Sequence, residues 1–237
     1  MSDTDGTAPD TSSVELLITL GRDREAVAAA TVQHNTDRQK TLHLGEKMDG
    51  AQQLDQLMPV LHGLVDRISA EQLDDETPCA NFTVTGVLEH MIGGAGVFSP
   101  MLRGEAPSVS ADAQTTTGTL QDRWRAAMVD LLDAVHDEDA AERTIASPFG
   151  EVPGAVFMRF VAFDGLVHGW DLATATQQRY APPDDLVREV DAFARQAVVP
   201  DMRNGDTFAA ETEAPADAGM LERLVAFSGR QVMSRKA

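Results

Sequence analysis

Cysteine, basic residues and long uninterrupted apolar runs are all scarce in this chain. Its single cysteine, Cys79, excludes an intrachain disulfide. Lys and Arg number 19 against 38 Asp and Glu, which gives a formal net charge of -19. Because so acidic a surface repels phosphate groups, we expect neither nucleic acid nor an anionic membrane among its partners.

The apolar segments are too often interrupted to predict a transmembrane helix. The N-terminus is acidic and polar, and it carries neither the basic nor the apolar region of a signal peptide. These features predict a cytoplasmic protein. The chain has 237 residues, of which 43% are hydrophobic, and this is enough for one sizeable core.

In most of the chain apolar residues recur every three or four positions, which is typical of amphipathic helices. The pattern predicts helices over residues 51–68, 84–103, 119–138, 154–176 and 184–199, and a short one over 221–230. No strand pattern is as strong, although residues 147–154 have turn chemistry that suits a small hairpin. The sequence therefore predicts an all-α protein built on a helical bundle.

The N-terminal part differs in composition from the rest. Residues 1–13 are rich in Ser, Thr, Asp, Pro and Gly, so we expect a disordered tail. Residues 14–50 are polar with one short candidate helix near the start, and we expect an N-terminal helical extension there. Residues 51–237 are expected to form the bundle.

Polar side chains interrupt the apolar face of the predicted helix 154–176. Asp164 and His168 are one turn apart and therefore point to one side. Burying either without a partner would cost several kcal/mol. His90 is a second histidine in apolar surroundings, close to Gly93 and Gly94 on the predicted helix 84–103.

Two imidazole nitrogens and one carboxylate oxygen would hold a metal ion and leave coordination positions open. That donor set suits catalytic Zn²⁺, and equally Fe²⁺ or Ni²⁺. Asp171, one turn past His168, could orient the other ring nitrogen of that histidine. A buried hydrogen-bonded polar cluster would explain the same pattern without a metal, and the spacing alone leaves both interpretations open.

Three stretches, residues 77–90, 103–105 and 164–173, resemble the DinB-like superfamily. They are most similar to its actinobacterial metal-binding branch, which is related to the N-terminal domain of mycothiol-dependent maleylpyruvate isomerase. The resemblance covers roughly residues 50–230. It implies a DinB-like four-helix bundle, here with extra N-terminal and C-terminal helices, and a homodimer.

The resemblance also implies a divalent metal, with Zn²⁺ expected before Ni²⁺ or Fe²⁺, on His90, Asp164 and His168. Many relatives have histidine or glutamate where Asp164 stands, so the shorter aspartate leaves the identity of the metal open. In the family the metal activates a low-molecular-weight thiol, such as mycothiol, for attack on a small electrophilic substrate. Their own positions in the predicted helix indicate that Asp171 could support the ligands or accept a proton, and that Arg159, which interrupts the apolar residues, could bind a substrate carboxylate.

Two other functions remain open at this point. The same site could be a metal-dependent hydrolase, in which water replaces the thiol. The bundle could also be a non-catalytic small-molecule-binding or stress-accessory protein. Cys79 has no basic neighbours in the sequence, so we expect it to pack as a small apolar residue in a loop.

Overall fold

The computed structural model describes residues 48–80, 82–105, 118–147, 150–203 and 208–233. The predicted tail (1–13) and almost all of the predicted N-terminal extension (14–50) lie outside these residues. Within the described ranges the chain forms six α-helices and one two-stranded sheet. The predicted all-α class is therefore confirmed.

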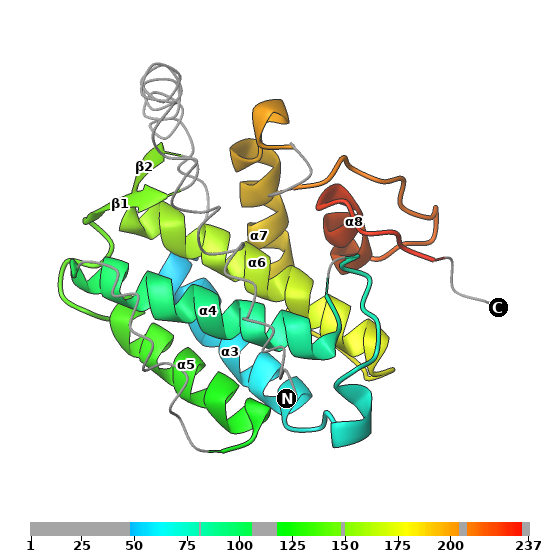
Figure 1. The fold of residues 1–237 in the computed structure, drawn as a ribbon. Coiled ribbons are helices and arrows are strands. Elements are labelled where there is room, and N and C mark those ends of the chain that lie inside the picture. The colour runs from blue at the N-terminus through cyan, green and yellow to red at the C-terminus, as the bar shows by residue number, and fades with distance from the viewer. Residues whose placement is uncertain (1–47, 81, 106–117, 148–149, 204–207, 234–237) are drawn as a thin grey trace, which may run out of the picture. The chain divides into compact units, whose positions relative to one another are not determined.

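The bundle consists of α3 (Gly50–Val65), α4 (Val84–Arg103), α5 (Leu120–Val135) and α6 (Gly154–Ala175). Each of these helices packs against two of the others: α3 and α4 each contact both α5 and α6 (Figure 1). Between α5 and α6 the chain forms the strands β1 (Thr144–Ser147) and β2 (Gly150–Pro153), which is the small hairpin expected from the turn residues.

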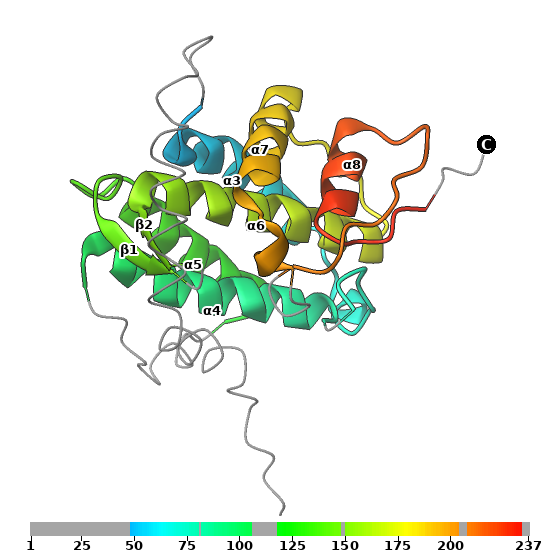
Figure 2. The same ribbon diagram turned by 90° about the horizontal axis from the view of Figure 1, so that it is seen from above.

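Two more helices follow the bundle, namely α7 (Asp184–Ala197) and α8 (Met220–Phe227). Helix α7 packs on α6 and α3, and α8 packs on α7 and α6 (Figure 2). The extra C-terminal helices expected from the resemblance are thus present. All six helices belong to the larger of two compact units of the chain, and so does every residue of the site described below.

The core is formed by the apolar faces that the periodicity predicted. Its largest fully buried side chains come from all four bundle helices, among them Leu57, Leu61, Leu88, Trp124 and Phe163. None of the described helices is both long and apolar enough to cross a membrane.

The start of α4 is fixed by its cap. The Thr83 hydroxyl accepts a hydrogen bond from the backbone N–H of Gly86, which satisfies one of the free donors at the helix N-terminus. Gly104, with φ of 75°, ends the helix in the left-handed conformation that glycine adopts most easily. The caps define both ends of α4, and burial of its apolar face against the bundle sets the direction of His90.

The start of α6 depends on a close backbone approach. A Cβ atom on Gly154 would overlap the carbonyl oxygen of Ala140, so only glycine fits there. The Gly154 N–H donates to the carbonyl oxygen of Arg143, and the Ala155 N–H donates to that of Ala141. These contacts hold the first turn of the helix that carries most of the candidate site.

Candidate metal centre

Helices α4 and α6 bring His90, Asp164 and His168 together. The carboxylate of Asp164 lies between the two imidazoles, with its Oδ1 3.4 Å from Nε2 of His168 and its Oδ2 3.8 Å from Nε2 of His90. One donor atom from each residue lies within 4.8 Å of the other two. The three side chains named from the sequence therefore converge on one point.

The site is buried on one side and open on the other. The side chain of His168 is 6% exposed, whereas those of His90 and Asp164 are 35% and 48% exposed. The Phe82 ring lies beside both imidazoles, with its centroid 5.4 Å from that of His90 and 6.5 Å from that of His168. A small ligand can therefore reach the cluster from the side of His90 and Asp164.

The spacing of the donor atoms bears on the choice between a metal site and a hydrogen-bonded cluster. A hydrogen bond from a ring N–H would bring the carboxylate oxygen to about 2.7–3.2 Å. Two atoms bonded at about 2.1 Å to one tetrahedral Zn²⁺ ion are instead about 3.4 Å apart. The contacts of 3.4 and 3.8 Å, which involve the two different oxygens of Asp164, are both longer than such a hydrogen bond, and three donors within 4.8 Å of one another could also hold a divalent cation.

The second ring nitrogen of His168 has a partner of its own. His168 Nδ1 lies 3.1 Å from Oδ2 of Asp171, the contact expected from their spacing on the helix. The side chain of Asp171 is fully buried. With Nδ1–H donating to Asp171, Nε2 is the His168 nitrogen that faces Asp164, and on loss of its proton its lone pair would be available to a metal.

Arg230, which follows α8, completes this buried chain of contacts. Its Nη2 donates to Asp171 Oδ2 at 2.8 Å and its Nε donates to Asp171 Oδ1 at 3.3 Å. This forked pairing suits a guanidinium and would not be reproduced by lysine. Arg230 therefore fixes the carboxylate that in turn orients His168.

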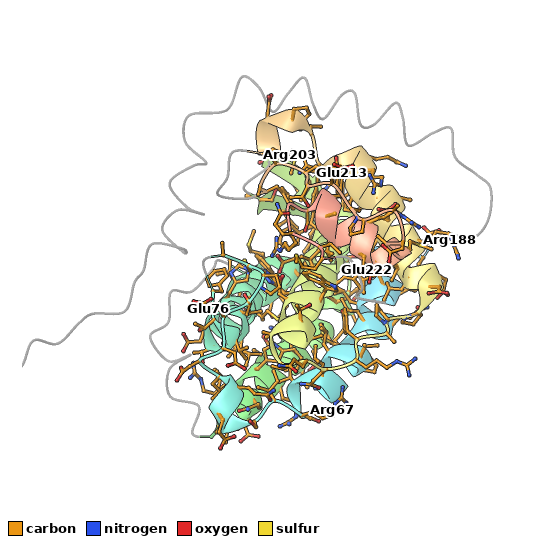
Figure 3. All side chains as sticks on the ribbon, turned by 90° about the vertical axis from the view of Figure 1, so that its right-hand side faces the viewer. Arg67, Glu76, Arg188, Arg203, Glu213 and Glu222 are labelled. Carbon is orange, nitrogen blue, oxygen red and sulfur yellow. The ribbon has the colours of Figure 1, made fainter. Side chains whose placement is uncertain are left out.

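The segment that carries Arg230 is held by a second arginine. Arg203, labelled in Figure 3, donates hydrogen bonds to the carbonyl oxygens of Ala209 and Phe227. Its guanidinium also lies over the Phe227 ring, 4.4 Å from the centroid. The end of α8 is thus fixed from two directions, and Arg230 follows it by three residues.

Electrostatics couple the two histidines to the carboxylates. Burial would lower the pKa of His168, but the nearby Asp164 and Asp171 outweigh burial and raise the pKa to about 9. Burial would raise the pKa of Asp164, but the imidazoles of His168 and His90 outweigh burial and hold it well below its usual range. Without metal, the pair at neutral pH is therefore an imidazolium beside a carboxylate.

This pairing predicts opposite pH dependences for stability and for metal affinity. A metal must displace the His168 proton, so its apparent affinity should rise about tenfold per pH unit from about pH 7 to 9. Since the folded pKa of His168 is raised, its contribution to the stability of the metal-free protein is present below pH 6.5 and is lost as the pH rises through 9. Competition titrations with a chelating dye and thermal melts across this range will measure both slopes. An affinity that falls with rising pH would contradict the assignment.

Cys79 lies closer to the site than its sequence context indicated. Its Sγ, a ring nitrogen of His168 and a carboxylate oxygen of Asp171 all lie within 4.8 Å of one another. Cys79 has no basic neighbour in the sequence, but Arg230 is near it in space: burial would lower the pKa of Arg230, and Asp171 and, to a smaller extent, Cys79 raise it. The loop before Thr83 thus contributes both Cys79 and Phe82 to the surroundings of the cluster.

Arg159 does not join the cluster. Its guanidinium lies over the Phe193 ring of α7, 4.5 Å from the centroid. Burial lowers the pKa of Arg159 and outweighs the attraction of Glu189. The guanidinium of Arg159 therefore packs against α7, and its binding of a substrate carboxylate stays a prediction.

The sequence model of the mycothiol maleylpyruvate isomerase N-terminal domain matches residues 54–173. This range contains His90, Asp164, His168 and Asp171 but not Arg230. Two uncharacterized proteins of Mycobacterium tuberculosis, from strains CDC 1551 and H37Rv, are each 34% identical to this chain over 170 residues. The matched region covers 71% of this chain and 91% of each relative. No solved structure matches the chain. From the match over half of its length and from these relatives, the chain belongs to the mycothiol maleylpyruvate isomerase N-terminal domain family.

Proposed function

We propose that this protein is an enzyme that binds a divalent cation through His90, Asp164 and His168, and that it activates a low-molecular-weight thiol of the mycothiol type. Zn²⁺ is the first candidate because two imidazoles and one carboxylate are typical ligands of catalytic zinc. The observation that carries the proposal is the convergence of the three side chains, whose donor atoms lie within 4.8 Å of one another beside an exposed face of Asp164 and His90.

The bound cation would lower the pKa of a thiol that takes an open coordination position, and would thereby supply a nucleophilic thiolate at neutral pH. The chain's own residues prepare the ligands for this task. Asp171 accepts a hydrogen bond from His168 Nδ1–H, which leaves Nε2 as the nitrogen that would coordinate. Arg230 holds Asp171 in place through two contacts.

These groups differ in burial, and we assign them different roles for that reason. Asp171 is fully buried and already paired with Arg230 and His168, so it suits an orienting role better than acceptance of a proton from the substrate. Asp164 and His90 are partly exposed and line the side from which thiol and electrophile would enter. Arg159 is left out of this proposal because its guanidinium is packed on Phe193.

The test begins with protein purified without added metal. Elemental analysis should find about one equivalent of Zn²⁺, Ni²⁺ or Fe²⁺ per chain, as for a site with three protein ligands. The metal-loaded protein is then assayed with a panel of electrophiles, with and without mycothiol. Saturable dependence on the thiol is expected. Turnover that ignores the thiol would reject thiol activation and favour the hydrolase, and a chain that binds no divalent metal would overturn the proposal as a whole.

A further inference from the structure

A narrow cavity of about 30 Å³ lies among the four bundle helices and reaches the candidate metal centre. His90 of α4 and Asp164 of α6 form part of its lining. The remaining lining side chains come from α3, α4, α5 and α6. The cavity therefore runs from two of the proposed ligands into the core of the bundle.

Apart from His90 and Asp164, every residue that lines the cavity is apolar. Leu57 of α3, Met91 of α4 and Leu131 of α5 are representative. No lysine or arginine is among the lining residues. A carboxylate pushed into this space would lose its hydration without gaining a cation, which costs several kcal/mol. The chemistry of the lining therefore selects an uncharged, apolar group.

The width of the cavity limits the shape of that group. Gly94 and Gly165 lie along it, and a Cβ at these positions would come within 3.2 Å of the Phe98 ring and of Leu57 Cδ2 respectively. A space of this size holds only one or two small groups in line. Met91 and Met128 can adjust their flexible side chains to lengthen it. A slender chain fits such a space, whereas a branched one does not.

We propose that the cavity receives a short, unbranched, uncharged aliphatic group of the substrate, while the reacting end of the substrate stays at His90 and Asp164. This assignment rests on the proposed function, since it gives a substrate class to the same site. It differs from a site for dicarboxylates, because the charged groups of a dicarboxylate would find no cation among the residues that line the cavity.

Methionine methyl groups provide a direct readout. The full chain, labelled with ¹³C at the methionine methyls and free of metal, is titrated with 1-butanol, tert-butanol and maleate. 1-Butanol should shift the signals of Met91 and Met128 saturably and leave that of Met233, which is 85% exposed, unchanged. tert-Butanol should bind about tenfold more weakly, and maleate should cause no shift at these methionines.

Two glycines of α4 form a matched pair of variants. Gly94→Ala adds a methyl beside the cavity and should weaken 1-butanol binding about tenfold. Gly93→Ala adds one where a Cβ meets nothing within 4 Å, and should leave binding unchanged. Leu131→Ala lengthens the cavity and should strengthen the binding of 1-hexanol.

The titration of the unchanged protein tests the proposed use of the cavity even if a variant fails to fold. Equal binding of 1-butanol and tert-butanol, shifts caused by maleate, or no shift at Met91 and Met128 would each overturn the assignment. Because the titration is run without metal, its failure is distinct from a failure to bind metal. A chain that binds 1-butanol in this way but no divalent cation would overturn the proposed function instead.

Discussion

His168→Ala is expected to weaken the binding of a divalent metal more than any other single substitution in the chain. His168 is the least exposed of the three proposed ligands, and it is the one whose second nitrogen is held by a buried carboxylate. Loss of a residue that merely supports a ligand lowers metal affinity about 10- to 100-fold, so loss of this ligand should exceed about 100-fold. Competition with a chelating dye measures the change directly.

Two further variants provide metal affinities with which that of His168→Ala is compared. Asp171→Asn keeps the shape of the side chain and removes its charge, so we expect an intermediate loss of about 10- to 100-fold. His136→Ala serves as the control, because His136 caps the end of α5 and pairs with Asp55 through an exposed contact. If His168→Ala retains the affinity of the unchanged protein, the three residues do not form the metal site.

Much of this arrangement follows from periodicity alone. The predicted helix 84–103 coincides with α4, and the predicted helix 154–176 differs from α6 by one residue at its end. The Thr83 cap marks the start of α4, which has one apolar face, whereas α6 is buried on most sides, and there the one-turn spacing of Asp164 and His168 is the informative signal. The side on which His90, Asp164 and His168 stand could therefore be inferred from the sequence.

Contacts between residues far apart in the sequence could not be inferred from periodicity. Arg230 is 59 residues from Asp171, and no local pattern relates the two. The periodicity also predicts that the last helix continues to Arg230, whereas α8 ends at Phe227. The chain leaves the helix there, and Gly229, with φ of 101°, turns it so that Arg230 can reach Asp171. The proximity of Cys79 to Arg230 could not be inferred for a similar reason, since the two residues are far apart in the sequence.

Among substitutions of charged side chains that are partly exposed, Arg230→Ala is expected to cause the largest loss of folding stability. The substitution removes the forked partner of Asp171 and leaves a fully buried carboxylate with His168 as its remaining contact. Breaking a buried ion pair from one side costs about 3–5 kcal/mol, because the remaining charge stays desolvated. Chemical denaturation followed by circular dichroism, on metal-free protein, measures this loss.

Arg125→Ala is the matched control. Arg125 also makes two contacts with carboxylate oxygens, one on Asp66 and one on Asp122, but all three side chains are exposed. Exposed ion pairs contribute little to folding, so the midpoint of unfolding should hardly change. Equal losses for Arg230→Ala and Arg125→Ala would show that the buried ion pair contributes no more to folding stability than the exposed ones.

A double substitution separates the ion pair from simple loss of packing. In the Arg230→Ala background, Asp171→Asn removes the unpaired charge, so part of the lost stability should return. Metal affinity should not return with it, because the amide introduced by Asp171→Asn would no longer orient His168 as a carboxylate does. Stability and metal affinity would then respond differently to the same change. That separation is expected only if Arg230 acts on the metal site through Asp171 and His168, and not through the general packing of α8.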